Sequence, residues 1–161
     1  MPRQKIVIYP GSFDPPTNGH LDLIRRASEV FNHVVVAVLR NESKTALFTV
    51  EERMEMLSEA TKDLENVSID SFSGLLVDYA RTRDARLILR GIRAISDYEY
   101  ELQMALMNRH LEAELETLFM PAAEQYSYLS SRLVKEVNRL GGDISKLVPP
   151  NVARRLTEKA S

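Results

Sequence analysis

The sequence predicts an α/β fold in which residues 1–161 form a single domain. We expect a doubly wound, five-stranded parallel sheet with helices on both faces and a C-terminal helical segment. Two observations support this expectation. Apolar runs of strand length alternate with segments whose apolar residues recur at helical spacing. The chain has 161 residues, 44% hydrophobic and 27% charged, which suits a domain with a substantial core. Such a Rossmann-like sheet buries its strands between two layers of helices.

The expected strands are short apolar runs bounded by Gly, Pro or charged residues. They cover residues 5–9, 33–39, 67–71, 87–90 and 117–120. The segments between them read as helices, at residues 19–31, 50–64, 74–83 and 97–111, with another at 130–140. Capping boxes are expected at Thr49–Glu52 and Ser96–Glu99, and Pro150 should lie in the first turn of a last short helix.

Five segments should gather at one edge of this sheet. Ligands of open α/β sheets bind beyond the carboxyl ends of the strands, where the strand order changes direction. The segments that follow the strands are residues 10–20, 40–48, 72–76, 90–96 and 121–131. All but the turn at 72–76 carry polar groups suited to phosphate, so this edge is the expected binding site.

The most informative segment runs from Gly11 to His20 and reads Gly-Ser-Phe-Asp-Pro-Pro-Thr-Asn-Gly-His. It joins a strand to a helix N-terminus, whose free N–H groups and positive dipole end attract anions. The glycines allow close backbone approach, the prolines stiffen the turn, and His20 lies in the first helical turn. The segment matches neither common phosphate-loop pattern. An ordinary turn with a capping histidine remains the structural alternative.

Two further segments carry cations toward the same edge. Arg90-Gly91-Ile92-Arg93 ends an apolar strand, and guanidinium groups match the geometry of phosphate oxygens. Lys44 lies in the loop after the second strand. A solvated charged turn is the alternative for each, and the expected position at the ligand edge favours the functional interpretation.

Hydroxyl and carboxylate groups add to the pattern. The segment from Tyr126 to Arg132 leads into a helix, where Ser130 or Ser131 is expected to cap the N-terminus or hold phosphate. Acidic residues from Asp97 to Glu101 suit the start of the preceding helix, although Glu101 could instead contact a ribose or a metal-bound water. No nucleophile–histidine–acid signature and no histidine cluster is present, which favours phosphoryl-type chemistry based on positioning and charge stabilisation.

Composition excludes several classes of function. The chain has no cysteine, so disulfides, thiolate catalysis and cysteine-bound zinc are excluded. A net charge of −2 gives no sign of a nucleic-acid or membrane partner. The sequence shows no leader peptide and no apolar stretch of 18 residues, so the expected location is the cytoplasm.

With these motifs, the chain resembles the nucleotidylyltransferases of the Thr-x-Gly-His class, and among them the bacterial phosphopantetheine adenylyltransferase family of coenzyme A synthesis. The first motif alone indicates the superfamily. The Arg-Gly-Ile-Arg and Asp-Tyr-Glu-Tyr-Glu segments are more specific, and other matching segments follow in family order from Tyr9 nearly to the C-terminus. They are Ser43-Lys44, Phe48–Arg53, Met107-Asn108-Arg109 and Ser130-Ser131 with Val134-Lys135-Glu136.

The resemblance implies direct in-line transfer of the adenylyl group of ATP to 4′-phosphopantetheine, giving dephospho-coenzyme A and pyrophosphate. It implies catalytic roles for His20, Lys44, Arg90 and Ser12. Substrate binding is implied for Ser12, Lys44, Leu76, Arg90 and Asn108. ATP binding is implied for Ser12, Phe13, His20, Gly91, Ile92, Arg93, Glu101, Tyr126, Ser127, Tyr128, Leu129, Ser130, Ser131 and Arg132.

The resemblance also implies partners. Mg²⁺ would accompany ATP without an identified protein ligand, since magnesium often stays bound to water and phosphate. A homohexamer and feedback inhibition by coenzyme A are further expectations. Two alternatives stay open: a related enzyme whose acceptor is nicotinate mononucleotide or a polyol phosphate, and a catalytically silent nucleotide-binding module.

Overall fold

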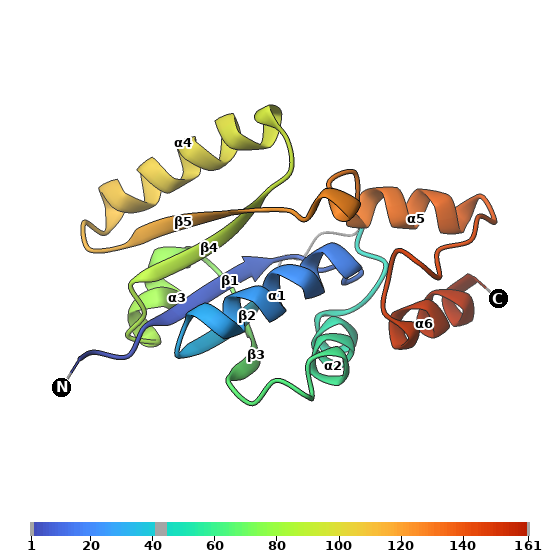
Figure 1. Ribbon diagram of the computed structural model, residues 1–161, viewed down its shortest axis with the longest axis horizontal. Helices are drawn as coiled ribbons and strands as arrows, with labels where there is room; N and C mark the ends of the chain where they lie inside the picture. Colours follow the sequence, from blue (N-terminus) through green and yellow to red (C-terminus); the bar gives the residue numbers. More distant parts are fainter. Residues whose placement is uncertain (1, 41–44, 161) are drawn as a thin grey trace.

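The computed structural model describes residues 2–40 and 45–160, apart from the side chain of Ser96. Five parallel strands form a sheet with the order β3-β2-β1-β4-β5 (Figure 1). The direction of the strand order reverses beside β1, so its carboxyl end and that of β4 flank the crevice where ligands bind in such sheets. The predicted α/β fold is confirmed, with strands β1 Ile6–Gly11, β2 His33–Leu39, β3 Val67–Phe72, β4 Leu87–Ile92 and β5 Glu116–Pro121.

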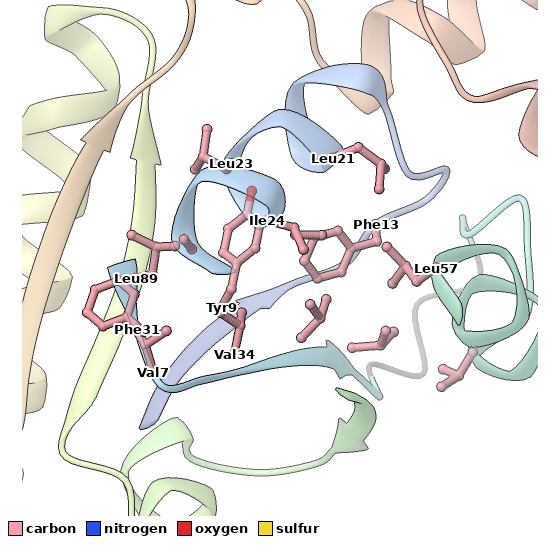
Figure 2. Close-up of a cluster of buried hydrophobic side chains, with 14 residues drawn as sticks. Val7, Tyr9, Phe13, Leu21, Leu23, Ile24, Phe31, Val34, Leu57 and Leu89 are labelled. Atoms are coloured by element: carbon pink, nitrogen blue, oxygen red, sulfur yellow. The ribbon is translucent and has the colours of Figure 1, made fainter. Parts of the chain in front are cut away.

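Helices cover both faces of the sheet. Alternate residues of β1 point to opposite sides: Val7 and Tyr9 pack with α1 and α2, whereas Ile8 packs with α3. Figure 2 shows the first of these clusters between the sheet and α1. The main helices are α1 Asn18–Val30, α2 Val50–Ala60, α3 Leu76–Thr82, α4 Ile95–Leu111, α5 Ser131–Arg139 and α6 Pro150–Ala160, and a 3₁₀ turn spans Glu124–Tyr126.

A third core lies beyond the carboxyl ends of the strands, where α5 and α6 pack near α2 (Figure 1). Its centre is Phe48, which is 1% exposed and comes from the segment before α2. Leu129 and Val134 contribute from the region of α5, and Val152 and Leu156 from α6. The C-terminal segment therefore builds one wall of the ligand edge and is part of the folded core.

Local sequence signals explain most helix starts. The predicted capping box at α2 is confirmed, because Thr49 accepts from the Glu52 N–H and Glu52 accepts from the Thr49 N–H. The capping box predicted at Ser96 is wrong. Helix α4 begins at Ile95, with Ala94 as an N-cap that makes no side-chain hydrogen bond. The Asp97 carboxylate instead accepts from the backbone N–H of Arg93, one turn earlier.

Several predicted boundaries are off by a few residues. Helix α3 begins at Leu76 and not at residue 74, because Gly74 has a φ of +80°, outside the helical range. Helix α2 ends at Ala60 and not at residue 64.

No helix in the described part of the chain is long and apolar enough to cross a membrane.

Candidate active site

Two cavities open side by side at the carboxyl ends of β1 and β4. The first has a volume of about 300 Å³ and the second about 470 Å³. Both are lined by Ser12 from the loop after β1, by Arg90 from β4 and by Glu101 from α4. Because these residues form the boundary between the cavities, groups bound in the two cavities would meet at Ser12 and Arg90.

The loop after β1 is shaped by its own side chains. Phe13 has a φ of 51°, and its ring packs edge-on against Tyr9 at 5.3 Å and His20 at 4.9 Å between ring centroids. A Cβ at Gly11 would lie 3.1 Å from the Phe13 ring, which is tighter than ordinary contacts. The glycine therefore allows the aromatic ring to lie under the first cavity.

The histidine of the motif is held in one orientation at the start of α1. The Thr17 backbone N–H donates to His20 Nδ1 over 3.0 Å, and the Thr17 hydroxyl accepts from the His20 backbone N–H. Since a backbone N–H only donates, Nδ1 is an acceptor and the neutral ring carries its proton on Nε2. This Nε2–H has no partner in the described part of the chain, and the side chain lines the first cavity.

Burial, and then the positive charges of Arg93 and Arg90, lower the pKa of His20 from 6.5 to about 4. His20 is therefore neutral near pH 7. It can act there as a hydrogen-bond donor toward an anion, but not as a cation.

Arg90 is fixed by a two-point ion pair. Its Nε and Nη2 donate to the two Glu101 carboxylate oxygens at 2.8 and 2.7 Å, and Nη1 donates to the Pro10 carbonyl at 2.8 Å. The Glu101 side chain is 11% exposed and that of Arg90 32%. The pair joins β4 to α4, and Arg90 also joins β4 to the end of β1, so these residues form the wall between the two cavities.

Arg93 has a similar arrangement on the outer side of the first cavity. It donates to the Asp97 carboxylate at 3.1 Å and to the Leu129 carbonyl at 2.8 Å. Both guanidiniums of this cavity are thus paired with carboxylates. An anion there must also be held by neutral donors.

The start of α5 supplies such donors. The Ser130 hydroxyl caps the helix by accepting from the Leu133 N–H, and the Ser131 hydroxyl donates to the Pro15 carbonyl. The backbone N–H group of Ser131, which lines the cavity, has no partner among the described residues. At α1 the expected free N–H groups are mostly used: Asn18 N–H donates to the Leu147 carbonyl, and Gly19 N–H is left without a described partner.

A buried charged network that motif analysis missed supports the loop. Asp14, 6% exposed, accepts from the backbone N–H groups of Leu47 and Phe48 and from Lys135 Nζ. Arg53, 4% exposed, donates to the Ser12 carbonyl at 2.8 Å. Asp14 lies in the Gly11–His20 segment and Arg53 in the Phe48–Arg53 segment, so both belong to motifs identified in the sequence. Their contacts could not be predicted, because the partners are distant along the chain.

The structure brings most of the predicted site residues together. Leu76 and Asn108 line the second cavity with the shared Ser12, Arg90 and Glu101. Four predicted residues, Ile92, Ser127, Tyr128 and Arg132, line neither cavity, and Lys44 lies outside the described residues. The individual roles stay predictions. The predicted residues that line the first cavity are Ser12, Phe13, His20, Arg90, Gly91, Arg93, Glu101, Tyr126, Leu129, Ser130 and Ser131.

Gly91 has a packing role beside its expected ligand role. A Cβ at this position would lie 2.8 Å from Leu23 Cδ2, so the backbone of β4 fits closely against α1. The same close fit leaves Leu23 and Gly91 together on the floor of the first cavity.

The donor set does not suit a protein-held metal ion. The described residues contain no group of three or more His, Asp or Glu side chains that could hold one. The two carboxylates of the first cavity, Asp97 and Glu101, are paired with arginines. A divalent cation at this site would have to be bound mainly by ligand oxygens and water.

The chain matches known proteins in both sequence and fold. Residues 8–137 match the sequence model of the cytidylyltransferase-like family. Structures of Plasmodium falciparum nicotinic acid mononucleotide adenylyltransferase complexed with NaAD and with APC share the fold, with TM-scores of 0.71 and 0.70. They are 15% and 14% identical to this chain, and the alignments cover 97% of this chain and 96% of each of theirs.

Two relatives are much more similar in sequence. The phosphopantetheine adenylyltransferase of Alkaliphilus metalliredigens is 52% identical over 156 residues, which cover 97% of this chain and 99% of that protein. That of Desulfosudis oleivorans is 52% identical over 155 residues, covering 96% and 92%. The chain belongs to the phosphopantetheine adenylyltransferase family, as its motifs predicted.

The low pKa of His20 predicts a pH-dependent stability. Between about pH 6.5 and 4 the unfolded chain protonates this histidine and the folded chain does not, so stability is lost as the pH falls through this window. We expect a contribution of about 2 kcal/mol between pH 7 and 4.5 that is absent in His20→Asn. Urea unfolding of both proteins at the two pH values gives the free energies of unfolding that measure this contribution. An equal pH dependence in the two proteins would contradict the account.

Proposed function

We propose that this chain transfers the adenylyl group of ATP to 4′-phosphopantetheine, forming dephospho-coenzyme A and pyrophosphate. The observation that carries the proposal is the junction of two chemically different cavities at Ser12 and Arg90. The first is lined by arginines, serines and helix N-termini, which suit a nucleotide with its phosphates. The 52% identity to proteins named phosphopantetheine adenylyltransferase supports the assignment of the acceptor.

The second cavity suits the pantetheine arm. Its walls are largely apolar, with Leu39, Phe72, Leu76 and Ile88 among the lining residues, and Asn108 supplies an amide. A flexible chain containing amide groups fits such a lining, because its methylenes bury apolar area while a few polar groups fix its position. The acceptor's phosphate would then lie at the junction, beside Ser12 and Arg90.

The proposed step is a direct displacement. An oxygen of the 4′-phosphopantetheine phosphate attacks the α-phosphorus of ATP, a new P–O bond forms, and the bond to the bridging oxygen of pyrophosphate breaks. Pyrophosphate leaves with the bonding electron pair. A phosphate monoester needs no general base, and the protein contributes mainly position and charge stabilisation.

His20 and the residues at the junction divide the work in this proposal. His20, neutral and protonated on Nε2, donates to a non-bridging oxygen of the α-phosphate as negative charge builds up there. Ser12, Lys44 and Arg90 hold the acceptor's phosphate against the repulsion between the two anionic substrates. Mg²⁺ would arrive with ATP and reduce the charge of its phosphates.

We also propose that the protein self-associates, with a hexamer as the expected state. Helix α4 leaves apolar side chains exposed along its length, including Ile95 at 82%, Leu106 at 59% and Met107 at 53%. A large apolar surface of this kind indicates an interface.

Coenzyme A shares the adenylyl and pantetheine parts of the product, so we propose that it inhibits by occupying both cavities. The need for ATP makes the cytoplasm the proposed location.

The reaction is tested by pyrophosphate release from Mg-ATP. We expect release to depend on 4′-phosphopantetheine and turnover to fall about 10²–10³-fold in His20→Ala, the usual scale for losing one charge-stabilising donor. His33→Ala is the matched control, since His33 lies at the start of β2 and pairs with Ser68. Turnover only with nicotinate mononucleotide or a polyol phosphate would overturn the acceptor. ATP binding without turnover of any acceptor would indicate a silent module.

The proposed interface is tested by introducing charged side chains on α4. Replacing Leu106 and Met107 by Glu places two buried charges in a contact that α4 would make, so we expect the assembly to dissociate into smaller species. Light scattering after gel filtration measures the mass. Val30→Glu is the control, because Val30 is also apolar and 67% exposed but lies on α1. A wild-type monomer, or a double variant of unchanged mass, would contradict the proposal.

A further inference from the structure

Tyr9 is a polar residue of the first cavity for which the motifs assign no role. It lies in β1, is 6% exposed and lines the cavity. Its ring packs edge-on against Phe13, and its centroid is 6.4 Å from that of His20. Figure 2 shows the phenol extending from β1 toward α1, with its oxygen on the side of Leu23, another residue of the cavity lining.

The Tyr9 hydroxyl has no hydrogen-bond partner in the described part of the chain. Buried tyrosine hydroxyls usually find one, because an unpaired polar group loses its hydration without compensation. Unlike the unpaired Thr117 Oγ1, the Tyr9 oxygen is not fully enclosed by protein. The hydroxyl thus lies at the end of a buried ring, at a surface that a bound molecule can reach.

The surroundings define what this hydroxyl can bind. The charges of Arg90, Arg93 and Glu101 influence its ionisation. Burial raises the pKa of Tyr9 well above 10, so the group stays an O–H donor at neutral pH. The Glu101 carboxylate is already occupied by two hydrogen bonds from Arg90. A bound ligand can supply the acceptor for the Tyr9 proton.

Two other unpaired groups of this cavity are donors as well. The Nε2–H of His20 and the backbone N–H of Gly19 both lack partners in the described chain, and both residues line the same cavity as Tyr9. Donors that line one cavity together with two guanidiniums complement oxygens that carry negative charge.

We propose that the Tyr9 hydroxyl donates a hydrogen bond to a phosphate oxygen of the bound nucleotide, which makes Tyr9 a substrate-contacting residue. This inference rests on the proposed function for the identity of the nucleotide and deepens it. It also gives the packing of Tyr9, Phe13 and His20 a role in binding: the three rings hold one another in place, and the polar ends of Tyr9 and His20 reach the same polyanion.

The variant Tyr9→Phe tests this directly, because it removes one oxygen and keeps the ring in the core. We expect the Kd for ATP to rise about 10- to 100-fold, the range for a hydrogen bond to a charged group. The Kd for adenosine, which lacks phosphate, should be unchanged. Calorimetric titration of the apo protein with each probe gives both values. Tyr79→Phe is the matched control: its hydroxyl pairs with Asp70, away from both cavities, and ATP affinity should be kept.

Stability of the apo protein supplies the second readout. An unpaired hydroxyl contributes no hydrogen bond to the fold, so Tyr9→Phe should match or exceed the wild-type Tm, and only the increase in Tm caused by ATP should shrink. A lower Tm without ligand would show that the hydroxyl has a protein partner and would overturn the proposal. So would an unchanged Kd for ATP, or equal losses for ATP and adenosine.

The binding assay separates this inference from the proposed reaction. A wild-type protein that binds ATP but transfers nothing to 4′-phosphopantetheine would refute the reaction, while the Tyr9→Phe titration would still decide the phosphate contact. A wild-type protein that binds no ATP would refute both.

Discussion

The two-point ion pair between Arg90 and Glu101 is the interaction on which the site depends most. It ties the end of β4 to α4 and, through the Pro10 carbonyl, to the end of β1 just before the loop. All three elements meet where the strand order reverses, and the pair forms the boundary between the two cavities. Without it, a partly buried guanidinium would be left uncompensated beside the loop that carries Ser12.

The pairing of both arginines has a consequence for binding. Arg90 and Arg93 are matched by Glu101 and Asp97, so the first cavity is not strongly positive by formal charge. Binding of a triphosphate must then rely on oriented neutral donors: hydroxyls, helix N–H groups and a neutral histidine. Such donors need no reorganisation when charge moves during the reaction, which is the condition for stabilising a transition state.

Much of the architecture could be predicted from the sequence. Strand β2 lies at the predicted residues, because this seven-residue run is rich in β-branched valine and is bounded by polar residues, a pattern that favours a buried strand. The start of α4 could not be predicted, because Ser96 resembles a cap while Asp97 pairs with Arg93. The contacts of Asp14, Arg53 and Tyr9 were also missed. Each depends on partners brought together by the fold, which spacing along the chain does not reveal.

A crystal structure with dephospho-coenzyme A tests the central claim most directly, since this molecule joins the adenylyl group of ATP covalently to 4′-phosphopantetheine. The account predicts the adenylyl part in the first cavity, the pantetheine arm in the second beside Leu76 and Asn108, and the linking phosphates at Ser12 and Arg90. A molecule bound wholly within one cavity, or with its arm outside the second, would contradict it.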